Sequence, residues 1–167
     1  MLQRLTALND RIPLHNSTLT RFHSRGAPQI SLVDYLQRIV RYAALEPICL
    51  LVLLIYIDRI CNRSRTFIVS SLTVHRLVIT AFCCASKALC DSYLTNATYA
   101  KIGGVSTHEL NILELDFLSL IDWDVCCNAD LLQIYYVNLV KQHPAYTRKP
   151  PPPLRSPTRW AGQHHPP

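Results

Sequence analysis

The sequence predicts an all-α protein, a single bundle of five helices followed by a sixth, with flexible termini. Apolar residues recur every three or four positions in successive segments, which is the helical period. Capping residues precede these segments, and glycines or polar loops end them. No segment alternates apolar and polar residues as a half-buried strand does. At 167 residues, 49% of them hydrophobic, the chain has the size of one domain with additional terminal segments.

Composition divides the chain into three predicted regions. Residues 1–27 form an amino-terminal arm, residues 28–142 a helical domain and residues 143–167 a disordered, Pro-rich, basic tail. Eight of the eleven prolines lie in the tail, including four consecutive prolines at 150–153, which favour polyproline II. We therefore expect one folded unit between two flexible ends.

The formal net charge of +6 belongs to these ends. Residues 28–142 hold nine Lys and Arg against ten Asp and Glu, so the predicted domain is close to neutral. A folded domain that binds nucleic acid usually carries its basic patch on the domain itself. We therefore expect no direct contact with nucleic acid.

A capping residue and a proline predict where the first two helices begin. Ser31 is a predicted N-cap with Asp34 in the capping-box position, and its helix ends before Pro47. That proline opens the second helix, which extends to Cys61. The apolar run at 48–57 has ten residues, whereas a membrane-spanning helix needs about 20. Because this run is apolar on every side, we expect a helix at the centre of the bundle and no membrane association.

The third and fourth helices follow a polar loop at 62–67. Ser70 or Ser71 is predicted to cap the third helix, which reaches about Leu89. The short fourth helix covers 97–102, and the glycine pair that follows it ends the helix, since glycine readily adopts the left-handed turn found there.

The fifth helix begins at a capping box in the sequence "STHELNILELDF". Ser106 accepts a backbone N–H that lacks a helical partner, and the carboxylate of Glu109 is expected to reach back to the first residue. A sixth, amphipathic helix is predicted over 129–140.

A carboxylate lies inside the apolar face of the fifth helix. Leu110, Leu113 and Phe117 share this face, and at about 100° per residue Glu114 falls within the same arc. Burying a carboxylate is costly unless a cation meets it. Lys87, on a polar edge of the third helix, is the natural candidate, although spacing alone favours a surface lysine on a solvated edge.

Residue types with catalytic chemistry form no recognisable site. The sequence has no nucleophile elbow and no phosphate-binding loop, so we expect no enzymatic activity. Its seven cysteines have no C-x-x-C spacing and predict reduced thiols packed as small hydrophobic side chains, as in a protein of the nucleus or cytoplasm. We expect no metal, cofactor or small-molecule ligand. His75 is interpreted as a packing or hydrogen-bonded histidine and not as a catalytic base, and Asp58 and Arg59 as an internal ion pair that closes the bundle.

Four segments together resemble a known family. They read "VDYLQRIVRYA" (33–43), "YIDRIC" (56–61), "SLTVHRLVITAFCCASKALCD" (71–91) and "TNATYAKIGGVSTHELNILELDFLSLIDWDV" (95–125). In combination they resemble a cyclin box. More narrowly, they are similar to the plant U-type (P-type) cyclins, which are related to the phosphate-responsive cyclin of budding yeast.

The resemblance implies a fold, a partner and two site residues. A cyclin box is a five-helix bundle that binds a cyclin-dependent kinase and pushes the kinase's mobile regulatory helix into its active position. In cyclins, the lysine of the "ASK" stretch and an acid on the fifth helix grip the kinase, and these residues correspond to Lys87 and Glu114. This correspondence reverses the interpretation of Lys87 as a surface lysine. Gln29 stands where mitotic cyclins carry the arginine of a substrate-docking patch, so we do not expect that patch.

We therefore predict an activating subunit of a cyclin-dependent kinase that acts in the cell cycle or in nutrient and phosphate signalling. The alternative is a cyclin-fold adaptor or transcription-factor-like scaffold that does not activate a kinase. The sequence does not specify which kinase or which substrates are involved. In the tail, Ser156 begins a Ser-Pro-x-Arg sequence that resembles the site preferred by cyclin-dependent kinases, and it is a predicted phosphorylation site.

Overall fold

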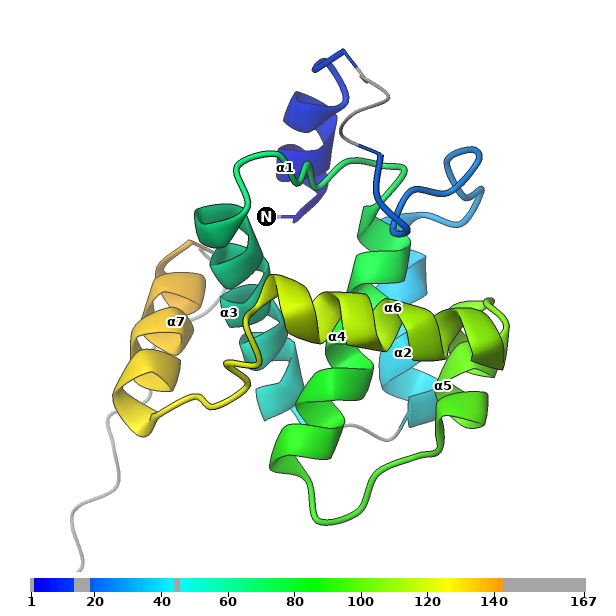
Figure 1. Cartoon of the computed structure of the whole chain (residues 1–167). Helices are drawn as coiled ribbons and strands as arrows, with labels where there is room; N and C mark the ends of the chain where they lie inside the picture. Colours follow the sequence, from blue (N-terminus) through cyan, green and yellow to red (C-terminus); the bar gives the residue numbers. More distant parts are fainter. Residues whose placement is uncertain (1, 14–18, 44–45, 143–167) are drawn as a thin grey trace, which may run out of the picture.

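The computed structural model describes residues 2–13, 19–43 and 46–142, and across these residues the protein is helical without strands. The predicted all-α class is confirmed. Figure 1 shows α6 crossing the front of α4, with α5 and α7 on opposite sides of the bundle. In chain order the helices are α1 (Leu2–Asn9), α2 (Leu32–Ala43), α3 (Ile48–Arg63), α4 (Val74–Leu89), α5 (Asn96–Gly103), α6 (Thr107–Leu120) and α7 (Ala129–Lys141).

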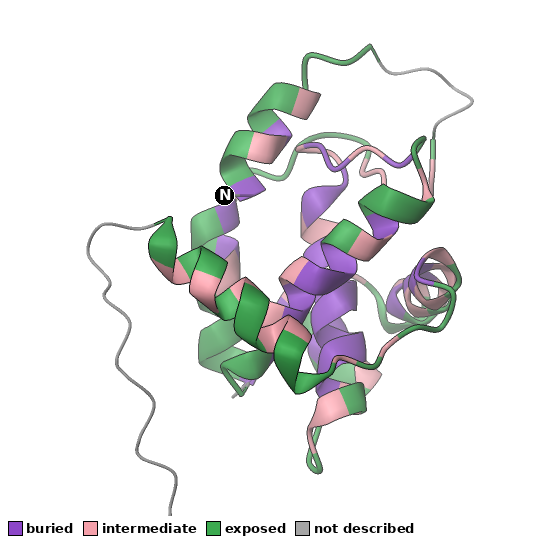
Figure 2. Ribbon diagram, turned by 90° about the vertical axis from the view of Figure 1, so that its left-hand side faces the viewer, coloured by how far each residue is buried: buried purple, intermediate pink, exposed green. Residues whose placement is uncertain are grey.

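The central helix is α4, whereas the sequence predicted the helix that became α3. Eleven of the sixteen residues of α4 are buried, and the helix packs against α2, α3, α5 and α6. The apolar run of α3 has a different cause, because α3 packs between α4 and α7. Figure 2 shows the buried residues concentrated in the helices behind α7, which itself has no buried residue. None of the helices in the described ranges is long and apolar enough to cross a membrane.

Local capping chemistry sets the ends of several helices. The hydroxyl oxygens of Ser31 and Ser106 each accept the backbone N–H three residues later, both at 3.1 Å. Gly104 has a φ of 72°, the left-handed conformation that ends α5. The Glu109 carboxylate does not return to its own N-cap as predicted, because it pairs with Arg76 of α4.

The predicted caps at Ser70 and Ser71 are wrong, since α4 begins at Val74. The hydroxyl oxygen of Thr73 accepts the backbone N–H of Ser70 at 2.9 Å. The next backbone N–H, that of Ser71, donates to Oδ1 of Asp10 at 2.8 Å. These bonds hold the segment before α4 in a turn against the end of α1.

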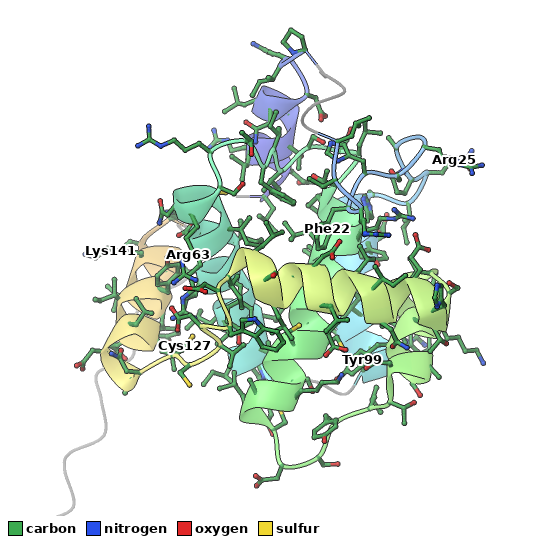
Figure 3. All side chains as sticks on the ribbon, viewed as in Figure 1. Phe22, Arg25, Arg63, Tyr99, Cys127 and Lys141 are labelled. Atoms are coloured by element: carbon green, nitrogen blue, oxygen red, sulfur yellow. The ribbon has the colours of Figure 1, made fainter. Side chains whose placement is uncertain are left out.

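The amino-terminal residues contribute to the core. Phe22 is fully buried and meets the ring of Phe67 edge to face, with 5.6 Å between ring centroids. The Asn9 side chain donates to the Val69 carbonyl at 2.9 Å. Phe22 lies beneath the amino-terminal segments and above α6 in Figure 3. The sequence boundary at residue 28 stays a prediction, and the predicted tail lies outside the described residues.

Replacing Phe22 with alanine should lower the free energy of unfolding by about 3–5 kcal/mol, the usual cost of emptying a buried phenylalanine site. Urea denaturation followed by circular dichroism measures this change. Leu19→Ala is the matched control, because Leu19 is 49% exposed and should change stability by no more than about 0.5 kcal/mol. Equal stabilities of the two variants would show that residues 19–30 do not belong to the folded core.

Candidate functional site

An ion pair joins the last turn of α4 to the middle of α6. Nζ of Lys87 donates to Oε1 of Glu114 at 2.6 Å. The Lys87 side chain is 31% exposed and that of Glu114 15%, so a partner can still reach the pair. Burial alone would lower the pKa of Lys87, but the hydrogen bond and negative charge of Glu114 outweigh burial and raise that pKa.

The second carboxylate oxygen of Glu114 also has a partner. Nδ2 of Asn96, the first residue of α5, donates to Oε2 of Glu114 at 2.7 Å and to Oδ1 of Asn111 at 2.8 Å. In turn, Sγ of Cys83 donates to the side-chain oxygen of Asn96 at 3.4 Å. The network fixes the position of the carboxylate from three helices, which is why an acid is tolerated on this apolar face. Nothing in the sequence singles out Asn96 from an ordinary residue at a helix start.

Exposed apolar side chains follow Glu114 along α6. Leu115 is 60% exposed and Leu118 is half-buried one turn beyond Glu114. After the helix, Asp122 and Trp123 both have left-handed backbone, with φ of 55° and 58°. Residues other than glycine rarely adopt this conformation, and here it leaves Trp123 62% exposed. Large apolar side chains held in solvent are typical of protein interaction surfaces.

The structure does not bring Asp58 and Arg59 together as an ion pair. Asp58 is exposed and accepts a hydrogen bond from the Tyr135 hydroxyl of α7 at 2.5 Å. Nε of Arg59 lies 3.3 Å from Oδ2 of Asp124, and its guanidinium also donates to the Cys126 carbonyl at 2.7 Å. Neighbouring residues of a helix point about 100° apart, so the two side chains hold different segments.

Arg63 supports the same connection from α6 to α7. Its guanidinium donates to the Ile121 carbonyl and lies 3.8 Å from a carboxylate oxygen of Asp122. Figure 3 shows Arg63 beside this connection, at the end of α3. Residues 121–126 are therefore held to α3 by two arginines.

The remaining residues singled out from the sequence are His75, the cysteines and Ser156. Nε2 of His75 donates to the Ile30 carbonyl at 3.1 Å, and the ring packs edge to face on Tyr35. Burial lowers the pKa of His75, which keeps the ring neutral. All seven cysteines are free, and no group of His, Cys, Asp or Glu within the described ranges could hold a metal ion. Ser156 lies outside the described residues.

The sequence is similar to proteins of one known family. A family model described as Cyclin matches residues 3–125, a range that begins inside the predicted arm. The Nuc-1 negative regulatory protein preg of Neurospora crassa is 47% identical over 158 residues, which cover 92% of this chain and 32% of the relative. The PHO85 cyclin PHO80 of Saccharomyces cerevisiae is 44% identical over 129 residues, 75% of this chain and 44% of the relative. Cyclin-U4-1 of Arabidopsis thaliana is 37% identical over 145 residues, 85% of this chain and 72% of the relative. The chain thus spans less than half the length of the two fungal relatives.

Arg59→Ala should lower the free energy of unfolding by about 2–3 kcal/mol, because it removes charged hydrogen bonds to backbone carbonyls. Asp58→Ala should cost only about 0.5–1.5 kcal/mol, since it removes one exposed bond to Tyr135. Urea denaturation of both variants gives the comparison, and Tyr135→Phe should match Asp58→Ala. A larger loss for Asp58→Ala than for Arg59→Ala would contradict these separate roles.

Proposed function

The chain belongs to the cyclin family, and we propose that it is a non-catalytic regulatory subunit that binds and activates a cyclin-dependent kinase. The observation that carries this proposal is the Lys87–Glu114 pair, which is hydrogen-bonded yet open to a partner. The names of two relatives, a PHO85 cyclin and a negative regulator of Nuc-1, support a regulatory role. The resemblance of the sequence to plant U-type cyclins, which are related to the phosphate-responsive cyclin of yeast, favours phosphate signalling over a cell-division role. A nuclear or cytoplasmic location would suit such a partner.

The chemistry of the pair suits recognition of a kinase backbone. The Lys87 ammonium has three N–H donors, of which Glu114 uses one, so the others can donate to carbonyls of the kinase. A carboxylate has about four lone-pair positions, and Lys87 and Asn96 take two at Glu114. Backbone N–H groups of the kinase can occupy the others.

Apolar contact would accompany these polar bonds. Leu115 and Leu118 extend the surface along α6, and Trp123 stands at its end. A kinase that covers this surface excludes water from the ion pair, which strengthens its electrostatic interactions. Activation then requires only that the surface bind the active kinase conformation more tightly than the inactive one.

Lys87→Ala and Glu114→Ala should each weaken kinase binding by about 2–4 kcal/mol, the cost of leaving one charge of a covered pair without its partner. Titration calorimetry with a purified cyclin-dependent kinase measures the affinity, and a phosphorylation assay measures activation. Lys101→Ala is the matched control, since Lys101 is an exposed lysine of α5. Folded variants that bind like the wild type would refute the proposed surface. Wild-type binding without activation would favour the scaffold alternative.

Asn96→Asp should weaken kinase binding more than Asn96→Ala. The alanine variant only removes a hydrogen bond that orients Glu114, whereas aspartate brings a second carboxylate to the place of a donor now 2.7 Å from Oε2. Two carboxylates at this separation repel each other and compete for the Lys87 ammonium. Titration calorimetry of both variants with the kinase measures the difference, and equal affinities would show that the Glu114 carboxylate does not contact the kinase.

A further inference from the structure

Two cysteines that are far apart in the sequence are in direct contact. Sγ of Cys49 lies 3.8 Å from Sγ of Cys90, and the residues are 41 positions apart. Cys49 is the second residue of α3, and Cys90 is the C-cap residue directly after α4. The contact therefore joins the start of one core helix to the end of another.

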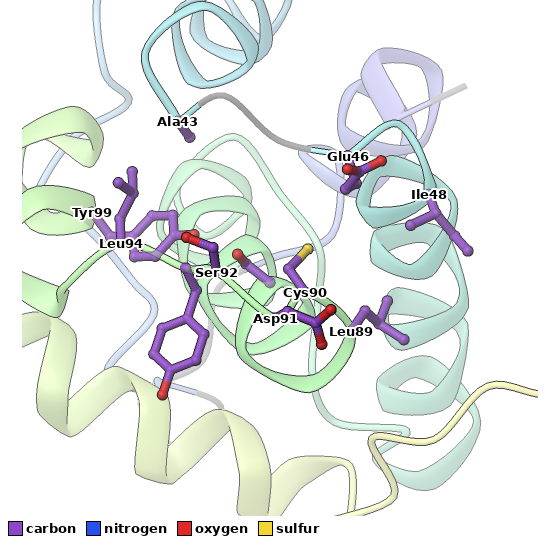
Figure 4. A pocket seen from close by; sticks show the side chains of 11 residues that line it. Ala43, Glu46, Ile48, Leu89, Cys90, Asp91, Ser92, Leu94 and Tyr99 are labelled. Carbon is purple, nitrogen blue, oxygen red and sulfur yellow. The ribbon is translucent and has the colours of Figure 1, made fainter.

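The two thiols differ in their access to solvent. Cys49 is fully buried, whereas Cys90 is half-buried and lines a cavity of about 570 Å³ that is open to solvent. Glu46 and Asp91 also line this cavity, and Figure 4 shows the Cys90 sulfur among them. A small dissolved oxidant can thus reach Cys90 first, with Cys49 directly behind it.

We propose that Cys49 and Cys90 form a site of oxidative modification, at which a peroxide converts the two thiols into a disulfide. In the first step the peroxide O–O bond breaks and Cys90 becomes a sulfenic acid, with release of one water. The Cys49 sulfur then attacks the Cys90 sulfur and forms the S–S bond. The displaced hydroxide takes the Cys49 proton and leaves as a second water. Two thiols and one hydrogen peroxide thus give one disulfide and two waters.

The backbone at Cys90 allows the sulfurs to approach. A disulfide needs about 2.05 Å between the sulfurs, so they must move closer by less than 2 Å. Cys90 has extended backbone, with φ of −106° and ψ of 135°, and the residues after it up to 95 form no helix. Its side chain can therefore move toward Cys49 without breaking a turn of α4.

Burial agrees with this order of reaction. Burial and the hydrogen bond with Cys90 raise the pKa of the Cys49 thiol to about 12, so Cys49 remains protonated near neutral pH. Since the thiolate is the form that peroxides oxidise, Cys49 does not react first. It acts as the resolving thiol once Cys90 is a sulfenic acid, because the departing hydroxide then accepts its proton.

The disulfide would affect the proposed kinase-binding surface. Lys87 lies one turn before Cys90 on α4, so the bridge would fix the helical turn that positions this lysine. This consequence rests on the proposed function, whereas formation of the disulfide does not.

Peptide mapping of the full chain after treatment with hydrogen peroxide tests the site without any kinase. After remaining thiols are alkylated, we expect a Cys49–Cys90 linked peptide in monomeric protein, reversed by dithiothreitol. The closed loop should raise the melting temperature by about 5–10 °C. Cys61→Ser, the matched control on α3, should still give the linked peptide, and Cys90→Ser should lose both the peptide and the rise in melting temperature.

A different mapping result would overturn the proposal. Conversion of Cys90 to a sulfinic acid while Cys49 stays alkylated would show that the pair does not close. Cross-links that join other cysteines, within or between molecules, would assign the reactivity elsewhere. Because the mapping uses no kinase, a failure of the kinase-binding proposal leaves its outcome unchanged.

Discussion

Burial of α4 on nearly every side is the constraint on which the rest of the bundle depends. A helix enclosed in this way can place cations only near its ends, and α4 has Arg76 at one end and Lys87 at the other. Both meet acids of α6, namely Glu109 and Glu114. The two cations are eleven residues apart, about 16 Å along α4, whereas the two acids are five residues apart, about 7.5 Å along α6. Long side chains bridge the difference, so the two pairs fix how α6 crosses α4.

The two pairs join the same helices but differ in their other contacts. The Arg76 guanidinium also donates to the backbone carbonyls of Arg21 and His23, so that pair ties the amino-terminal segment to the bundle. The Lys87–Glu114 pair has no such contact with the amino-terminal segment among the described residues, and its side chains stay 31% and 15% exposed. One crossing of two helices thereby provides a structural pair and the pair that we propose contacts the kinase.

Most of the helices could be predicted because their signals are local. Periodic apolar residues and caps such as Ser106 act within one or two turns, and they act in the same way in any fold. The meeting of Lys87 with Glu114 could be suggested but not decided from spacing, because it depends on the crossing of two helices. Burial of Phe22 and the role of Asn96 left no local signal at all.

The misplaced centre of the bundle has a similar cause. An apolar composition indicates that a helix is covered on all sides, but it does not identify the elements that cover it. In the structure, α4 covers one side of α3 and α7 covers another. The separation of Asp58 from Arg59 depends on the same arrangement. Asp58 accepts a hydrogen bond from Tyr135 of α7, whereas Arg59 pairs with Asp124 in the connection before α7.

The polar contacts that lock the helices together also set the order in which the protein can fold. The Tyr56 hydroxyl donates to the Val125 carbonyl, 69 residues away, and the Tyr35 hydroxyl to the Gly103 carbonyl, 68 residues away. Helical proteins usually fold quickly because their contacts are local. Here α2 and α3 lie early in the chain, whereas the carbonyl groups that accept from their tyrosines lie at residues 103 and 125. A chain that has not yet made these contacts exposes the apolar run of α3, and exposed apolar segments promote aggregation during folding.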